Sequence, residues 1–196
     1  SGGLGAETAR TLASKGATVV LVARDNTKLA SQAEAIKQST GSDRVHTQLM
    51  DLMDLDSVRQ ASAELLARFP KVNLLINNAG IMACPLARTV QGFESQMGVN
   101  HIAHFVFTQA LLPALKNNAP ARIVTLTSAA HKLADVNLDD MNWESREYNN
   151  WGAYGEAKTA NALFSTALQA RLAGTNVTSN CVHPGVIMTD LARSLT

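Results

Sequence analysis

Cysteine is scarce in this sequence, with only Cys84 and Cys181 among 196 residues. Two cysteines cannot build the dense disulfide framework that stabilises small secreted domains. The chain must therefore fold around a hydrophobic core, and 46% of its residues are apolar. Because free thiols persist in a reducing compartment, we expect a cytoplasmic protein.

The sequence also lacks an excess of charge and a long apolar run. Lys and Arg number 17 against 16 Asp and Glu, which gives a formal net charge of +1. This balance provides no electrostatic basis for binding nucleic acid or an anionic membrane surface. The longest apolar stretches are interrupted by Gln, Asn or His, so no segment is predicted to span a membrane.

The sequence opens directly on a glycine-rich segment at residues 1–5. The chain stops at Thr196, directly after a segment that we predict to be a loop. We therefore expect a domain that is truncated at both ends and lacks its first strand and its C-terminal segment.

Apolar runs rich in β-branched residues alternate with longer amphipathic stretches along the chain. The predicted strands are residues 18–23, 45–50, 72–76, 122–127 and 177–182. The predicted helices are residues 4–15, 27–38, 56–69, 92–112 (ending near Pro113) and 153–172. This alternation predicts one α/β domain over residues 1–196, with a doubly wound, Rossmann-like parallel sheet. In that topology the first strand lies between strands 18–23 and 72–76, so these two are not expected to pair directly.

Two glycines, Gly3 and Gly5, open the first predicted helix, which leads into a strand. Free N–H groups and the helix dipole make such a helix end a site for phosphate. The motif is weak alone, and an ordinary glycine-rich turn explains it equally well. Its place before a strand makes it a candidate dinucleotide site.

The end of the second element, Val22-Ala23-Arg24-Asp25, bears on the choice of cofactor. An acidic residue at this strand end would bind both ribose hydroxyls and repel a 2′-phosphate. Ala23 occupies that position and Arg24 follows it, so we expect NADP in preference to NAD. The alternative is a surface arginine paired locally with Asp25.

Tyr154 and Lys158 lie four residues apart in a helical pattern, so both project from one face of the helix. Proton transfer to a ketone needs a donor whose pKa is near neutral, whereas free tyrosine has a pKa of about 10. A lysine one turn away favours the phenolate and so lowers that pKa. The same spacing also arises by chance in many helices as an ordinary exposed pair.

Ser128 follows the strand at 122–127, at the carboxyl edge where open α/β sheets place their sites. Its hydroxyl can donate to a substrate oxygen, although a turn serine is the default at such a position. Trp143 and Trp151 flank the approach to Tyr154, either shaping a lipophilic pocket or simply packing. We do not assign a metal to His101 and His104, which lack a third ligand nearby. His131 suggests no hydrolase, because the G-x-S-x-G turn is absent around Ser128.

These pieces occur together in the order typical of the short-chain dehydrogenase/reductase family, which the chain resembles over essentially its whole length. The matching segments are SGGLG (1–5), DL (51–52), NNAG (77–80), VN (99–100), VTLTS (124–128), YGEAK (154–158) and HPGVIMT (183–189). The Thr-Gly that normally starts the family's phosphate loop is absent, together with the strand before it. The resemblance implies hydride transfer between a nicotinamide cofactor and an alcohol/carbonyl pair.

The resemblance also implies roles for individual residues. Tyr154 would be the general acid or base, Ser128 would hold the substrate carbonyl, and Lys158 would grip the nicotinamide ribose and lower the tyrosine pKa. Asn100 would hold a water in the proton relay. The implied cofactor contacts, besides Tyr154, Lys158 and Arg24, are the phosphate loop (Gly3, Leu4, Gly5), the adenine contacts (Asp51, Leu52), the turn beside the adenosine ribose (Asn78, Ala79, Gly80) and the carboxamide loop (Pro184, Gly185, Ile187, Thr189).

Within the family, SAAH (128–131) and the segment 151–168 resemble the branch of the retinol dehydrogenases and WW-domain oxidoreductases. The resemblance implies a lipophilic alcohol, ketone or aldehyde as substrate, and a homodimer or homotetramer paired through its long helices. Two alternatives remain on the same fold: a non-catalytic NADP-binding redox sensor, and an epimerase or dehydratase that keeps its cofactor bound. Occupation of all four positions by Asn100, Ser128, Tyr154 and Lys158 favours the enzyme.

Overall fold

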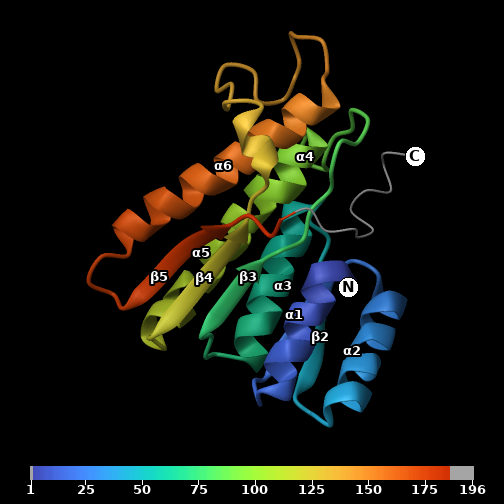
Figure 1. The fold of residues 1–196 in the computed structure, drawn as a ribbon, viewed down its shortest axis with the longest axis vertical. Coiled ribbons are helices and arrows are strands. Elements are labelled where there is room, and N and C mark those ends of the chain that lie inside the picture. Colours follow the sequence, from blue (N-terminus) through green and yellow to red (C-terminus); the bar gives the residue numbers. More distant parts are fainter. Residues whose placement is uncertain (1, 186–196) are drawn as a thin grey trace. The chain divides into compact units, whose positions relative to one another are not determined.

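The computed structural model describes residues 2–185, and these divide into two compact units. The first unit extends to Asp51 and the second begins at Leu52. Each unit is built from parallel strands joined through helices, as Figure 1 shows. Among the helices of this part of the chain, none combines the length and apolarity needed to cross a bilayer.

The first unit contains α1 (Gly3–Ser14), β1 (Val19–Ala23), α2 (Asn26–Thr40) and β2 (Val45–Leu49). The strands β1 and β2 are parallel, with Val19 opposite Val45 and Ala23 opposite Leu49. Apolar side chains from both helices and both strands form its core: Ala9, Ala13, Leu21, Leu29, Ala33, Ile36 and Val45. Since parallel strands need a crossover, α2 supplies the connection that brings β2 beside β1.

The second unit contains α3 (Leu55–Arg68), a three-stranded sheet and the helices that cover it. The strands β3 (Leu74–Asn77), β4 (Ala121–Leu126) and β5 (Val177–Val182) are parallel and adjacent in that order. Between β3 and β4 run α4 (Ser95–Met97), the π-helical turn η1 (Gly98–Ile102) and α5 (Ala103–Asn117). The short 3₁₀ helix η2 (Ala129–Lys132) and the long helix α6 (Asn150–Arg171) connect β4 to β5.

The predicted α/β class and parallel strands are confirmed, and the predicted boundaries outside the long helix agree to within three residues. Within residues 2–185, β1 pairs only with β2, and β3 only with β4. Because β1 and β3 belong to different units, the expectation that the first and third predicted strands do not pair directly stays a prediction.

The prediction for the long helix at 92–112 was wrong about its continuity and its end, although its start agrees to within three residues. Helix begins at Ser95 and is interrupted by the π-helical turn at residues 98–102. It then continues through Pro113 to Asn117. Proline removes one N–H, which leaves the carbonyl of Gln109 without its helical partner. Gln109 and Pro113 are both exposed, so water can satisfy that carbonyl, while Leu111 and Leu115 stay buried and hold the helix in place.

Candidate active site

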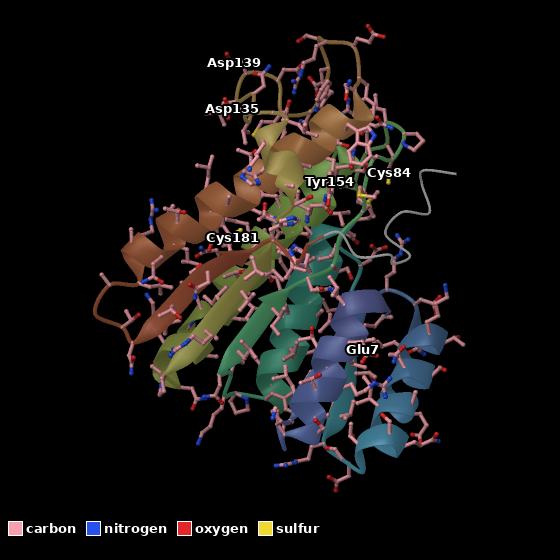
Figure 2. All side chains as sticks on the ribbon, in the orientation of Figure 1. Glu7, Cys84, Asp135, Asp139, Tyr154 and Cys181 are labelled. Atoms are coloured by element: carbon pink, nitrogen blue, oxygen red, sulfur yellow. The ribbon has the colours of Figure 1, made fainter. Side chains whose placement is uncertain are left out.

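The candidate site lies in the second unit, where the carboxyl end of β4 meets the first turns of α6. Ser128 follows β4 and caps η2, because its Oγ accepts a hydrogen bond from the Ala130 N–H at 3.2 Å. Tyr154 lies near the start of α6, whose first turn is capped by the Asn149 side chain (Figure 2). The predicted serine and tyrosine are thereby carried by two elements that pack against each other.

Gly155 explains why these two elements approach so closely. A Cβ atom at this position would lie 2.9 Å from the backbone oxygen of Ala130 in η2. Only a residue without a side chain allows that contact. The approach brings Ser128 within hydrogen-bonding reach of the Tyr154 hydroxyl, and this bond lowers the pKa of Tyr154.

Lys158 lies one turn after Tyr154 and is almost completely buried. Its Nζ atom lies 5.6 Å from the centre of the Tyr154 ring and donates to the Leu126 carbonyl at 3.3 Å. The Leu126 carbonyl also accepts from Asn161 Nδ2 at 3.0 Å. In addition, the Thr127 hydroxyl donates to the Lys158 backbone oxygen at 2.8 Å. The end of β4 therefore fixes the backbone and the ammonium group of this lysine.

Burial is the largest cause of the pKa shift of both residues. It raises the pKa of Tyr154, and the hydrogen bond with Ser128 only partly opposes it. Burial also lowers the pKa of Lys158 to about 8, with a smaller opposing effect from the Cys181 thiol. In the protein alone, burial therefore outweighs the hydrogen bond with Ser128, and the expectation that Lys158 lowers the Tyr154 pKa stays a prediction.

Asn100 lies in the π-helical turn and is fully buried. Its side-chain amide makes two hydrogen bonds to the backbone of Ile81, accepting from the N–H at 2.8 Å and donating to the carbonyl at 2.9 Å. A Cβ atom at Gly80 would lie 2.9 Å from Asn100 Oδ1 and 3.7 Å from Lys158 Nζ. The structure therefore brings Asn100 and Lys158 close together, as the resemblance implies, and places Gly80 beside both, which was not predicted.

Two histidines that sequence reasoning set aside support this arrangement. His104 Nδ1 lies 3.0 Å from the Asn100 carbonyl, and burial lowers the His104 pKa to about 4. The ring is therefore neutral near pH 7, and its Nδ1–H donates to that carbonyl. His101 Nδ1 lies 3.1 Å from Asn161 Oδ1. Among residues 2–185, no group of three or more His, Cys, Asp or Glu side chains is placed to hold a metal ion.

The predicted phosphate loop begins α1 in the first unit. Gly3 has a φ of 54°, a conformation that glycine adopts without strain. No side chain caps this helix start, so its first N–H groups remain for another acceptor. Leu4 and Gly5 form the first turn and are partly exposed.

The predicted 2′-phosphate contact, Arg24, lies at the exposed end of β1. The local partner considered for it, Asp25, instead caps α2 by accepting from the Lys28 N–H at 3.0 Å. Its carboxylate also pairs with the Lys28 ammonium at 3.9 Å. Asp25 thus interacts with Lys28, which disfavours the alternative in which Arg24 pairs locally with Asp25.

The remaining predicted cofactor contacts follow the carboxyl ends of strands. Asp51 and Leu52 come after β2, and Asn78 and Ala79 precede Gly80 after β3. Pro184 and Gly185 follow β5, with Gly185 at a φ of 89°. Ile187 and Thr189 lie outside the described residues.

A buried ion pair beside the site was not predicted. Glu156, only 2% exposed, accepts two hydrogen bonds from the Arg146 guanidinium at 2.6 and 2.9 Å. The same guanidinium donates to the Asp140 carbonyl at 2.9 Å and stacks 3.5 Å from the centre of the Trp143 ring. These contacts fasten the segment before α6 to the helix that carries Tyr154. No sequence pattern predicts the contacts of Arg146 with Glu156, because the segment before α6 is irregular.

Comparison with known proteins connects this geometry to a family. The family model described as short chain dehydrogenase matches residues 1–196. Human retinol dehydrogenase 13 is 43% identical over 191 residues, which cover 97% of this chain and 58% of that protein. Mouse retinol dehydrogenase 12 is 44% identical over 192 residues, covering 98% of this chain and 60% of that protein. The chain thus spans about three fifths of the length of these curated relatives.

Solved structures are similar to this chain over nearly its whole length. An uncharacterised protein from Mycobacterium paratuberculosis superposes with a TM-score of 0.83 at 44% identity, covering 98% of this chain and 68% of that one. A short chain dehydrogenase from Shigella flexneri 2a, solved as a complex with NADP, superposes with a TM-score of 0.77 at 28% identity. That match covers 98% of this chain and 77% of the Shigella chain.

Proposed function

The chain belongs to the short-chain dehydrogenase family, and from that premise we propose that the protein transfers a hydride between NADP(H) and an alcohol/carbonyl pair. The observation that carries the proposal is the cluster of Ser128, Tyr154 and Lys158 at the carboxyl edge of β4, with Asn100 fixed close to the lysine. Open α/β sheets bind their ligands at this edge.

The residues present fit a nicotinamide cofactor. Lys158 uses one of its three N–H donors on the Leu126 carbonyl, and the others suit the hydroxyls of a ribose. The absence of a side chain at Gly80 lets Asn100 and Lys158 lie close to the backbone of this turn. When bound, the cofactor supplies or accepts the hydride at its nicotinamide ring.

In reduction, the Ser128 hydroxyl holds the substrate oxygen and Tyr154 donates a proton to it as negative charge develops there. In oxidation, the tyrosine accepts the proton instead. Lys158 favours the phenolate formed after the transfer, because its ammonium lies 5.6 Å from the ring centre in a buried site. Asn100 positions the water through which the proton is exchanged with solvent.

We propose NADP as the cofactor in preference to NAD. Arg24 lies exposed at the strand end where a 2′-phosphate is recognised, and Asp25 is occupied with Lys28. The Shigella structure solved with NADP supports the same choice. For the substrate we propose a lipophilic alcohol or carbonyl compound, which the names of the retinol dehydrogenases support.

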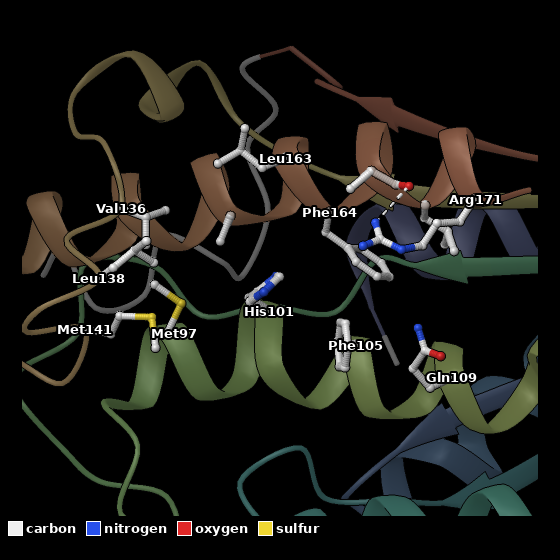
Figure 3. Close-up of a pocket in the computed structure, with 13 residues that line it drawn as sticks. Met97, His101, Phe105, Gln109, Val136, Leu138, Met141, Leu163, Phe164 and Arg171 are labelled. Carbon is white, nitrogen blue, oxygen red and sulfur yellow. Dashed lines mark hydrogen bonds between the residues drawn. The ribbon is translucent and has the colours of Figure 1, made fainter.

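We further propose that the protein forms a homodimer or homotetramer through α5 and α6. A groove of about 440 Å³ lies between these helices in the second unit, with apolar walls that include Phe105, Leu163 and Phe164 (Figure 3). Leu163 is 61% exposed and Phe105 42% exposed. Two other apolar residues of these helices, Leu111 and Leu168, are buried within the chain.

The test is consumption of free NADPH by the purified protein with a panel of ketones and aldehydes. The proposal predicts turnover that continues after the first equivalent of cofactor. Tight NADPH binding without consumption would favour the redox sensor. Conversion of a substrate with no net change in NADPH would favour an epimerase or dehydratase.

A further inference from the structure

The two tryptophans near Tyr154 have different surroundings. Trp143 is 8% exposed, and its ring is covered by the Arg146 guanidinium at 3.5 Å and by the Tyr148 ring at a centroid distance of 5.4 Å. Trp151 is 40% exposed, and its ring centre lies 6.1 Å from that of Tyr154. Trp143 is therefore a packing residue, while Trp151 presents free aromatic surface beside the reactive phenol.

The backbone beneath Trp151 is held firmly. Asn149 caps the first turn of α6 by accepting from the Gly152 N–H at 2.7 Å. The Asn150 side chain donates to the Ala83 carbonyl at 3.0 Å, which ties this turn to the loop after β3. Tyr148 adds a second tie, donating to the Cys84 carbonyl at 3.2 Å. The indole is thus displayed from a fixed position and not from a free loop.

The position of Trp151 places its ring beside that of Tyr154. It precedes Tyr154 by three residues, so both side chains lie on the same face of α6. The Tyr154 side chain is almost completely buried, and the Trp151 ring meets it at an interplanar angle of 82°. The exposed indole is therefore an aromatic surface next to the Tyr154 ring that the group adjoining a substrate oxygen can contact.

We propose that Trp151 is a specificity-determining residue that favours carbonyl compounds with a planar aromatic or conjugated group next to the carbonyl. The inference rests on the proposed oxidoreductase function and names the substrate class for the same site. An exposed indole attracts flat π systems in stacked or edge-to-face geometry at centroid distances of about 4.5–7 Å. A saturated ring of the same carbon count buries similar apolar area but offers no π face.

The experiment compares two ketones that differ in this respect, acetophenone and cyclohexyl methyl ketone. The purified protein is prepared unmodified and as Trp151→Leu, Trp151→Phe and Trp143→Phe. The ratio of kcat/KM for the aryl ketone to that for the cyclohexyl ketone is measured, and the Kd of each ketone is determined by calorimetry in the presence of NADP. The Kd of NADPH is measured for every variant.

We expect Trp151→Leu to lower the aryl/cyclohexyl ratio by about two- to tenfold, the usual size of one aromatic contact. Trp151→Phe keeps an aromatic face and should retain much of the preference, and the Kd of NADPH should not change. Trp143→Phe should lower the melting temperature and leave the ratio intact. An equal loss for both ketones in Trp151→Leu, or no loss at all, would overturn the inference.

The two readouts separate this inference from the function on which it rests. Selective binding of the aryl ketone that depends on Trp151, without NADPH consumption, would retain the inference and reject the oxidoreductase. Reduction of both ketones at a ratio unaffected by Trp151 would retain the oxidoreductase and reject the inference. Absence of both binding and reduction would reject the two together.

Discussion

The ammonium of Lys158 lies 5.6 Å from the centre of the Tyr154 ring, and its one hydrogen bond among the described residues goes to the Leu126 carbonyl. The pKa of Tyr154 is nevertheless raised by burial, and the pKa of Lys158 is lowered to about 8 by the same cause. The protein therefore holds a cation in a poorly solvated place. Such a cation costs stability unless a ligand with suitable oxygens shares the site.

The first prediction concerns the loss of folding stability that the buried Lys158 ammonium causes. In the unfolded chain Lys158 has its ordinary pKa of 10.5, so from about pH 8 to 10.5 the unfolded state binds more protons than the folded state. Stability must therefore rise with pH in this window, and the full cost of the buried cation is present below it. Lys158→Met removes the cation, while Asn161 still donates to the Leu126 carbonyl.

We expect the free energy of unfolding of Lys158→Met to increase by about 3 kcal/mol at pH 7, since one pKa unit corresponds to about 1.4 kcal/mol. The gain should shrink as pH approaches 10, and turnover should be lost. Urea unfolding at pH 7 and pH 9.5 measures both values. A variant that is less stable than the unmodified protein at pH 7 would contradict the argument.

The second prediction concerns Arg146 and Glu156. Glu156→Gln leaves the partly buried guanidinium without its bidentate partner, and removal of one member of a buried pair costs about 3–5 kcal/mol. Because Asp140 and Trp143 still contact Arg146, we expect a loss near the lower end, about 3 kcal/mol. Denaturant unfolding tests this.

The exposed pair of Glu7 and Arg10 on α1 provides the control. Glu7→Gln should change stability by less than about 1 kcal/mol. Equal effects of the two substitutions would show that the Arg146–Glu156 pair does not fasten the segment before α6.

The third prediction concerns cofactor choice. Arg24→Ala should remove most of the preference for NADPH over NADH, because a charged hydrogen bond to phosphate is worth about 1.5–3 kcal/mol, or roughly ten- to a hundredfold in Kd. Fluorescence titration with both cofactors measures the ratio. Lys28→Ala removes a nearby cation that is already paired with Asp25 and should alter the ratio little. The assignment fails if the unmodified protein binds NADH as tightly as NADPH.

The fourth prediction concerns assembly. Leu163→Arg places a charge in the apolar groove between α5 and α6 and should shift the protein to monomer. Val90→Arg alters an apolar residue that is more exposed but lies outside the groove, and should leave the assembly intact. Light scattering at micromolar concentration distinguishes the species. A purely monomeric unmodified protein would reject the proposed interface.

Regular features of this chain were predictable from local rules, and irregular ones were not. Periodicity located the strands, and the four-residue spacing placed Tyr154 and Lys158 on one face of α6. The rule that proline ends a helix failed at Pro113, because Pro113 and Gln109, whose carbonyl it leaves unpaired, are exposed residues on a helix whose other face is buried.

Contacts made through irregular segments could not be predicted from the sequence. Trp143 adopts a φ of 57°, which is uncommon for a residue with a side chain, and packs under Arg146. Neither this conformation nor the reach of Arg146 to Glu156 follows from periodicity. For the same reason, sequence alone left Trp143 and Trp151 equivalent, and only their different burial separates them.

The central claim is that Tyr154 transfers the proton, and Tyr154→Phe tests it most directly. Loss of a general acid typically costs at least about a hundredfold in kcat, while the retained ring should keep the Kd of NADPH nearly unchanged. The chain's other tyrosine, Tyr148, bonds to Glu94 and to the Cys84 carbonyl, so Tyr148→Phe is a matched control in which turnover should survive. The decisive measurement is kcat for NADPH-dependent ketone reduction by these two variants. The account predicts a drop of at least about a hundredfold for Tyr154→Phe alone, and retention of most activity in that variant would contradict it.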